Sequence, residues 1–388
     1  MRVVVERRFY QSNTREQPPH SDMHSDSASA SSPLRLLFVG EAWKGSCSRA
    51  LREALETLEA AVVSAVDVGQ YFPSYRSVVV RGGTRLLRPL QSKRLEHRIA
   101  QLLRVSYPDV FLAYKGYGIS RRLVRRMKIG GILTVNVFPD NSPQAYGRAL
   151  SRAIGEYDLV VSTKAFHPRG WQHVYGYRNT CVCVPHGYDP AVHYWQAAPS
   201  GQVLDVVLAA TWRPEYHRLM LAFAKEMRDE PCQVGLAGDG WSARRGEFPT
   251  HWSFEHTPTG REYGTFLRSG RIAIAPVQRE VVVGGRLQPG DEDSTRTYEL
   301  AAAQCFFLHR RTDYVQTVFD ERTEVPLWGN VRELAALVRH YLPRDQERRT
   351  MAAAAHARAV PEYSVPNRAA QVMAYVRGQL AVRHLLSE

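Results

Sequence analysis

Residues 290–309 of the 388-residue chain read GDEDSTRTYELAAAQCFFLH, a polar loop followed by an alanine-rich segment and an apolar run. This order predicts a short helix that leads into a buried strand. Ser294 or Thr295 can cap the helix by accepting hydrogen bonds from the free amides of its first turn. A helix that begins in this way presents N–H groups and the positive end of its dipole, which together suit a phosphate group.

Two side chains of this predicted helix add to the anion site. Arg296 lies just inside the helix and can hold a phosphate through a bidentate pair. Glu299 lies one turn further along, on roughly the same face, and can accept hydrogen bonds from sugar hydroxyls. The competing interpretation is an ordinary capped helix whose neighbouring acids complement its dipole.

The pattern Arg-x-x-Glu-x-x-Ala before an apolar strand resembles the donor-site segment of the group-1 glycosyltransferases, and within them the spore-maturation-protein-like branch. The resemblance implies that Glu299 contacts the ribose of a nucleotide-sugar donor. It also implies that an acid eight residues earlier contacts the transferred sugar. That position is Asp291 in this chain, and Glu292 and Asp293 compete with it for the role.

Composition limits the class of protein. The length allows two or three domains, and the apolar share of 44% is that of a globular protein. We expect no membrane-spanning segment and no signal peptide. The five cysteines are scattered, which argues against a zinc site or a disulfide framework and favours a reducing cytosol. The formal charge of +13 indicates a polyanionic or phosphorylated partner, unless it only reflects solvated basic faces.

The first half of the chain reads as an α/β domain. Residues 1–32 are polar and are predicted to be a disordered tail. Strand-like and helix-like segments then alternate, which predicts a doubly wound domain over residues 33–195. Ligands gather at the carboxyl ends of such strands. The polar residues expected there are Lys115, Asp140, Thr163 and His186.

The family resemblance extends through this half and assigns tasks to these residues. Many group-1 enzymes place a histidine near the position of Asp140, so the resemblance implies that Asp140 lies near the reacting carbon. The alternative is an Asx turn that closes a strand. Lys44, Lys115 and His186 are candidates for the acceptor side, although His186 is also placed to close a hinge turn.

A second β-α alternation predicts another domain over residues 202–365, and the helix predicted for residues 366–388 is expected to cross back to the first domain. The resemblance implies that Arg213 and Arg218, after the opening strand of this domain, are candidates for the donor pyrophosphate. It also implies that the turn with Gly238 and Gly240 borders the nucleobase, where glycines permit close approach of the backbone; the alternative is a plain turn. The loop 277–289 is expected to line the cleft.

The basic residues of the first half gather between residues 81 and 128. Four of them, Arg121, Arg122, Arg125 and Arg126, form pairs on one helix face. They are expected to face an anionic acceptor or a membrane, and the competing interpretation is a solvated face. No nucleic-acid module or set of stacking aromatics accompanies them, so nucleic acid is not the expected partner.

The sequence thus predicts an α/β fold with two doubly wound Rossmann-like domains, of the kind called GT-B, and a cleft between them. The predicted activity is transfer of a sugar from a nucleotide-diphosphate sugar to a glycan, a lipid-linked or a secondary-metabolite acceptor, with retention of configuration. We expect no metal or other cofactor, because helix amides and basic side chains neutralise the leaving diphosphate. The expected location is the cytoplasm or the inner face of the membrane. The alternatives are a nucleotide-sugar epimerase or hydrolase on this fold, and a non-catalytic protein that binds nucleic acid or membrane.

Overall fold

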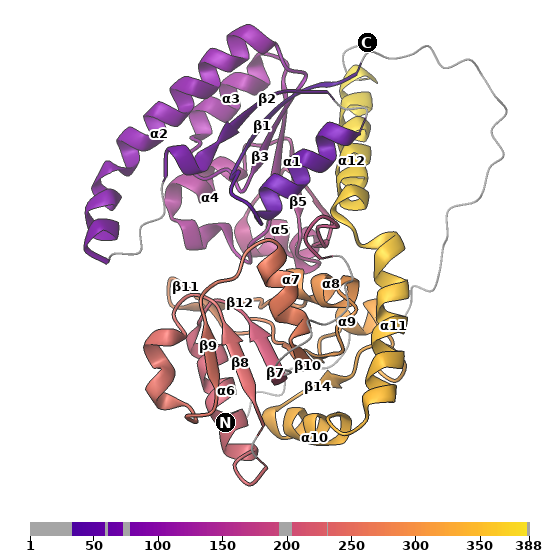
Figure 1. Cartoon of the computed structure of the whole chain (residues 1–388). Coiled ribbons are helices and arrows are strands. Elements are labelled where there is room, and N and C mark those ends of the chain that lie inside the picture. The colour runs from indigo at the N-terminus through magenta and orange to yellow at the C-terminus, as the bar shows by residue number, and fades with distance from the viewer. Residues whose placement is uncertain (1–32, 59–60, 73–77, 194–203, 231, 386–388) are drawn as a thin grey trace, which may run out of the picture. The chain divides into compact units, whose positions relative to one another are not determined.

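The computed structural model describes residues 33–58, 61–72, 78–193, 204–230 and 232–385 (Figure 1). The polar tail predicted for residues 1–32 and most of the predicted linker at 191–201 lie outside the described residues.

The first lobe is built on a six-stranded parallel sheet with the strand order β2-β1-β3-β4-β5-β6. The central strands of this sheet are buried on both faces, which explains their nearly continuous apolar sequence. The strands are β1 (Arg35–Gly40), β2 (Ala61–Asp67), β3 (Val110–Tyr114), β4 (Leu133–Phe138), β5 (Leu159–Ser162) and β6 (Thr180–Cys183).

Helices cover both faces of this sheet. One face packs against α1 (Cys47–Thr57) and against α12 (Val365–Leu385), the last helix of the chain. The other face packs against α2 (Val78–Ser106), α3 (Arg121–Ile129), α4 (Arg148–Ile154) and α5 (Phe166–Tyr175). Single 3₁₀ turns lie at η1 (Val68–Gln70) and η2 (Pro143–Tyr146).

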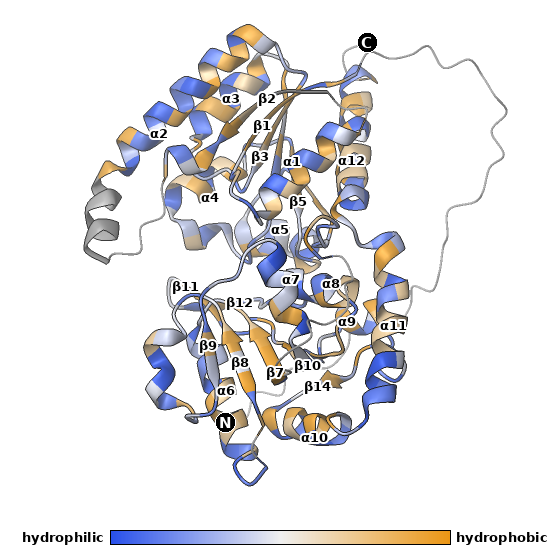
Figure 2. Cartoon of the chain, viewed as in Figure 1, coloured by the Kyte–Doolittle hydropathy of each residue, from blue (hydrophilic) through white to orange (hydrophobic). Residues whose placement is uncertain are grey.

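The second lobe repeats this plan with a parallel sheet of order β14-β13-β10-β7-β8-β9. Its strands are β7 (Leu204–Ala209), β8 (Val234–Ala237), β9 (Ser253–Glu255), β10 (Gly270–Ala275), β13 (Phe307–Arg310) and β14 (Leu327–Trp328). Its helices are α6 (Pro214–Glu226), η3 (Ser242–Glu247), α7 (Arg261–Arg268), α8 (Thr295–Ala302), α9 (Val315–Val318), α10 (Val331–Tyr341) and α11 (Asp345–Glu362). In Figure 2 the apolar colour follows the strands of this sheet, where the core lies.

The chain passes between the lobes at two neighbouring places. The N–H of Tyr188 donates to the carbonyl of Tyr363 at 3.0 Å, and the N–H of Val365 donates to the carbonyl of Tyr188 at 2.8 Å. From this junction α12 continues along α1, so the end of the chain completes the first lobe. Residues 33–388 make up one compact unit by their contacts.

Two parallel sheets with helices on both faces confirm the predicted α/β fold class. The loop expected at 277–289 instead contains an antiparallel hairpin of β11 (Val281–Val283) and β12 (Arg286–Gln288). Among the described residues, none of this segment lines the main cavity, and its residue Glu280 bonds to α6 instead.

Candidate functional site

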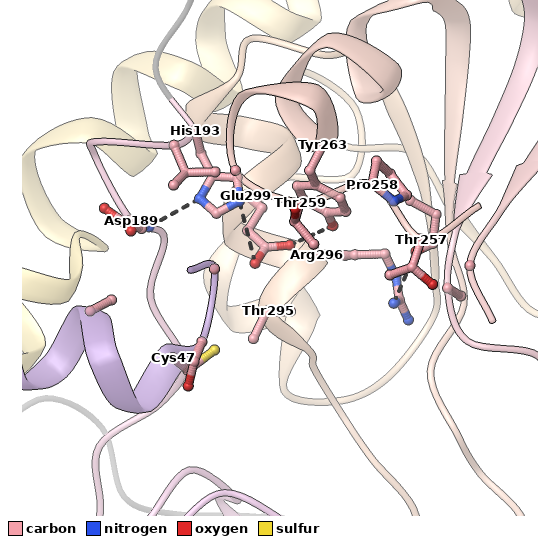
Figure 3. Close-up of a pocket in the computed structure, with 18 of the residues that line it drawn as sticks. Cys47, Asp189, His193, Thr257, Pro258, Thr259, Tyr263, Thr295, Arg296 and Glu299 are labelled. Atoms are coloured by element: carbon pink, nitrogen blue, oxygen red, sulfur yellow. Dashed lines mark hydrogen bonds and ion pairs between the residues drawn. The ribbon is translucent and has the colours of Figure 1, made fainter. Parts of the chain in front are cut away.

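A cavity of about 300 Å³ lies where the two lobes meet. The first lobe contributes the loop after β1 and the start of α1, including Trp43, Gly45 and Cys47. The second lobe contributes the turns that follow β7 and β8 and the beginning of α8. Figure 3 shows Thr295, Arg296 and Glu299 on α8 facing this space, with Cys47 across from them. These are the carboxyl ends of parallel strands, where ligands bind in folds of this kind.

Glu299 is a buried carboxylate at the wall of this cavity, with 8% of its surface exposed. Its Oε2 accepts a hydrogen bond from the Tyr263 hydroxyl at 2.7 Å, and its Oε1 lies 3.6 Å from His193 Nε2 (Figure 3). Burial and the nearby charge of Glu299 raise the pKa of Tyr263 well above its usual value, so this hydroxyl stays protonated and keeps donating. The carboxylate is therefore held in one orientation while its remaining lone pairs can accept from a ligand.

His193 is oriented by the segment that carries it. The N–H of Asp189 donates to His193 Nδ1 at 3.1 Å. A neutral imidazole whose Nδ1 accepts must carry its proton on Nε2, and that atom faces Glu299. Two donors from different segments, Tyr263 and His193, thus converge on one carboxylate.

Arg296 enters the same cavity from the first turn of α8. Two of its guanidinium nitrogens donate to backbone carbonyls at strand ends, to Ala209 at 3.2 Å and to Pro276 at 3.1 Å. Its Nε–H is buried and has no partner among the described protein atoms.

The start of α8 is fixed by its own side chains. Ser294 is the N-cap residue, one of the two candidates expected from the sequence, and its N–H donates to Thr297 Oγ1 at 3.0 Å. Thr297 Oγ1 also lies 2.8 Å from His309 Nε2, and burial lowers the pKa of His309 to about 4. The neutral His309 and Thr297 therefore fix the position of the start of α8 from inside the core.

The acidic residues before α8 lie beside the cavity rather than in its lining. Asp291 Oδ1 is 2.6 Å from the ammonium of Lys164, which follows β5 in the first lobe. Asp293 is buried and accepts from the Tyr298 hydroxyl at 2.8 Å, and burial raises its pKa to about 6. Burial also raises the pKa of Glu292, whose carbonyl accepts from Thr312 Oγ1 at 2.7 Å.

Asp140 and Lys115 form a pair at the ends of β4 and β3. Their carboxylate and ammonium are 2.9 Å apart, and the ammonium also lies 4.2 Å from the centre of the Tyr146 ring. Burial lowers the pKa of Lys115, but the interactions with Asp140 and Tyr146 together outweigh burial, so the pKa is raised and Lys115 stays charged. Lys115 has a φ of +66°, and the following Gly116 has a φ of +80°, so the strand ends in a tight turn.

The glycine and arginine candidates of the second lobe separate into two groups. Gly238 lines the cavity with a φ of +133°, and a Cβ there would lie 2.2 Å from the carbonyl oxygen of Ala210. Gly240 packs against Trp212 and is not part of the described lining. Arg213 is exposed at the N-cap of α6, and Arg218 bonds to Glu280 on the surface.

The acceptor-side candidates lie at the first-lobe edge of this region. Lys44 is exposed, and its aliphatic chain lies against Gly260 of the cavity wall. His186 lines a smaller neighbouring cavity of about 50 Å³, with its Nε2 3.4 Å from Lys164 Nζ. Burial and the charges of Lys164 and Arg368 lower the pKa of His186 well below its usual value, so it is neutral.

The structure thus brings Gly238, Thr295, Arg296 and Glu299 together at one cavity, and the roles of all the candidate residues remain predictions. Sequence reasoning missed Tyr263, His193 and Lys164. Lys164 carried a usable signal, because it directly follows Thr163 at a strand end. No local pattern in the sequence marks Tyr263 or His193, because the tertiary fold brings each of them to Glu299.

Half of the basic face on α3 is engaged within its own lobe. Arg121 Nε and Arg125 Nε donate to Glu156 at 2.5 and 2.8 Å. Arg122 and Arg126 are exposed. Within the part of the chain that is described, none of the helices combines the length and apolar character of a bilayer-spanning segment.

Residues 213–374 match the model of a family described as glycosyl transferase-like. No curated protein matches the chain. The match gives the second lobe and the final helices a glycosyl transferase-like domain, in agreement with the enzyme class predicted from the sequence. The match leaves the spore-maturation-protein-like branch undecided.

Solved structures share the fold over about nine-tenths of the chain. Sucrose-phosphate synthase from Thermosynechococcus elongatus is 13% identical with a TM-score of 0.65, covering 90% of this chain and 100% of that one. Anabaena HepE in complex with UDP is 13% identical with a TM-score of 0.61, covering 89% and 100%. A glycosyltransferase from Rickettsia africae is 12% identical with a TM-score of 0.62, covering 90% and 99%. The predicted two-domain GT-B fold is confirmed.

Proposed function

We propose that this protein transfers a sugar from a nucleotide-diphosphate sugar to an acceptor bound by the first lobe. The observation that carries the proposal is the cavity at the start of α8, where the fixed carboxylate of Glu299 and the side chain of Arg296 line the same space. This arrangement lies within the glycosyl transferase-like domain. Among the structures with this fold, HepE was also solved with UDP-glucose, which supports a nucleotide-sugar donor.

Each chemical part of the donor is matched to a different group of the protein at or near α8. Glu299 accepts from the ribose hydroxyls, and the Arg296 Nε–H and the first amides of α8 hold the diphosphate. The turn at Gly238 leaves room for the base. The transferred sugar then lies beyond the helix start, toward Asp291 and Asp140.

The same groups account for departure of the diphosphate. Negative charge grows on the leaving oxygen, and donors fixed in advance stabilise that charge without reorganisation. We therefore propose transfer without a metal ion and with retention of configuration. Of the two arginines considered for the diphosphate, Arg213 is the better placed, because Arg218 is bonded to Glu280.

The first lobe supplies the acceptor side. Lys44, Lys115 and His186 border the region where an acceptor would approach the sugar. The exposed Arg122 and Arg126 suit a peripheral contact with an anionic membrane at its cytoplasmic face, which would suit a lipid-linked acceptor. A glycan or a secondary-metabolite precursor fits the same side.

The test begins with thermal unfolding in a panel of nucleoside diphosphates and their sugar derivatives, since a ligand of the native state raises stability by mass action. One of them should raise the melting temperature, and Glu299→Ala should weaken its binding at about 0.5–1.5 kcal/mol for each hydrogen bond lost. The matched control is Glu262→Ala, which removes an exposed carboxylate next to Tyr263.

Three outcomes would contradict the proposal or a part of it. Absence of any stabilisation across the panel would exclude a nucleotide-sugar enzyme. Equal affinities for the Glu299→Ala and Glu262→Ala proteins would remove the ribose assignment. Rapid consumption of the donor without any acceptor would indicate a hydrolase instead.

A further inference from the structure

Lys164 is a first-lobe residue whose ammonium reaches into the second lobe. Its side chain is 4% exposed, and its Nζ lies 2.6 Å from Asp291 Oδ1. Burial lowers the pKa of Lys164, but the charges of Asp291 and Asp293 outweigh burial and raise it, so the ammonium is retained. A buried charge of this kind is costly unless its partner stays in place.

The loop that carries Lys164 is locked by a hydrogen-bonded chain beneath it. The N–H of Lys164 donates to Ser162 Oγ at 2.9 Å, and that oxygen lies 2.5 Å from His167 Nδ1. His167 Nε2 lies 2.8 Å from the carbonyl oxygen of Asn141, to which it can only donate. Burial lowers the pKa of His167 to about 4, so the ring is neutral and its Nδ1 accepts from Ser162.

The Lys164 ammonium makes a second contact within its own lobe. His186 Nε2 is 3.4 Å from Nζ, and the neutral imidazole can accept there. The ammonium therefore lies between a fixed neutral acceptor and the carboxylate of Asp291. Residues of the first lobe therefore determine where the Lys164 ammonium lies.

Asp291 is held by its own lobe only through its backbone. Its N–H donates to the carbonyl of Gln278 at 2.6 Å, and its carbonyl accepts from Arg279 at 3.1 Å. Lys164 is the cation paired with its carboxylate among the described ion pairs. Asp291 comes four residues before Thr295, the first residue of α8, so it lies past the helix end on the side where the sugar of a donor would follow its diphosphate.

We propose that Lys164 is a positioning residue for the donor sugar, which aims the Asp291 carboxylate and makes its contact with sugar hydroxyls depend on the first lobe. This inference rests on the proposed function. It predicts that the two parts of the donor differ in how they are held: the side chains proposed to bind the nucleotide belong to the second lobe, and the sugar is bound by a carboxylate that both lobes position.

The experiment compares equilibrium affinities for two probes, the nucleoside diphosphate that binds in the panel above and its hexose derivative, with UDP and UDP-glucose as the first pair. Lys164→Met removes the charge and keeps most of the side-chain length. The variant should bind the sugar nucleotide about 10- to 100-fold more weakly, since a hydrogen bond to a charged group contributes about 1.5–3 kcal/mol. Its affinity for the bare diphosphate should stay within about twofold, because well-separated sites act independently. The matched control is Lys225→Met, an exposed lysine on α6.

A double-mutant cycle separates positioning from a merely structural role. In an Asp291→Asn background, Lys164→Met should change the affinity for the sugar nucleotide by less than about twofold, because the group it acts through is already neutral. This comparison also serves if the single Lys164→Met variant fails to fold, since the double variant leaves no unpaired carboxylate at position 291.

The results that overturn the inference differ from those that overturn the function. Equal loss of affinity for both probes, unchanged affinity for the sugar nucleotide, or additive losses in the double variant would each refute the role of Lys164. In all three cases the wild type still binds nucleotide. A wild type that binds no nucleotide would refute the proposed function and this inference together.

Discussion

Replacing Asp293 by asparagine should stabilise the protein at neutral pH and change little in acid. Asp293 is 2% exposed, and burial raises the pKa of its carboxyl from 3.8 to about 6. A shift of about 2 units corresponds to about 3 kcal/mol between the neutral and charged forms. Asparagine cannot ionise and can still accept from the Tyr298 hydroxyl.

The sign follows from the uptake of protons. The native state binds a proton at Asp293 more readily than the unfolded state does, so the native state is favoured below pH 4. That advantage is lost as the pH rises through about 6. The free energy of unfolding of the Asp293→Asn variant should therefore be higher than that of the wild type by up to about 3 kcal/mol at pH 7.5. This difference should approach zero near pH 4.

Urea unfolding followed by tryptophan fluorescence, at several pH values between 4 and 7.5, measures this difference. The control is Asp229→Asn, whose carboxylate has 93% of its surface exposed and should give no comparable gain. An Asp293→Asn protein less stable than the wild type at pH 7.5 would refute the reasoning. A difference in the free energy of unfolding that stays constant across the pH range would refute it as well.

Two further changes test the cavity and the basic face. Gly238→Ala should cost about 1–3 kcal/mol of stability and weaken nucleotide binding, because the φ of +133° at this position and the neighbouring backbone oxygen exclude a Cβ. Gly246 has open space around it, so Gly246→Ala is the control for both melting temperature and affinity. Replacing Arg122 and Arg126 by glutamine should reduce sedimentation with anionic vesicles at low salt more than replacing the two arginines that bond Glu156. Equal binding by both pairs of variants would leave the exposed arginines without that role.

Most elements of the fold could be predicted because their patterns are local. The apolar runs that became β1, β3, β4 and β7 are short and bounded by turn residues, as buried parallel strands are. The sequence contains a signal for the hairpin of β11 and β12, although a loop was expected at residues 277–289. Gly284 and Gly285 both have positive φ, which a two-residue hairpin turn requires.

The candidate site was predictable only where one segment determines it. The capped start of α8 and the placement of Arg296 and Glu299 on its first turns follow from helix periodicity. The partners of these residues could not be predicted in the same way. Tyr263 reaches Glu299 from another helix of the same lobe. The contacts of His193 and Lys164 with acidic residues depend on how the two lobes meet.

The position of α12 has a consequence for how the protein is made. The apolar side chains of this helix, among them Val372 and Val376, cover one face of the first sheet together with α1. A ribosome releases the six strands of that sheet long before residues 365–385 emerge, so the newly made first lobe carries an incompletely covered apolar face until α12 has been made. Nascent chains that wait in this state are prone to aggregate and to need chaperones. A stop codon between residues 184 and 365 should therefore yield an insoluble product, even though the whole first sheet has been encoded.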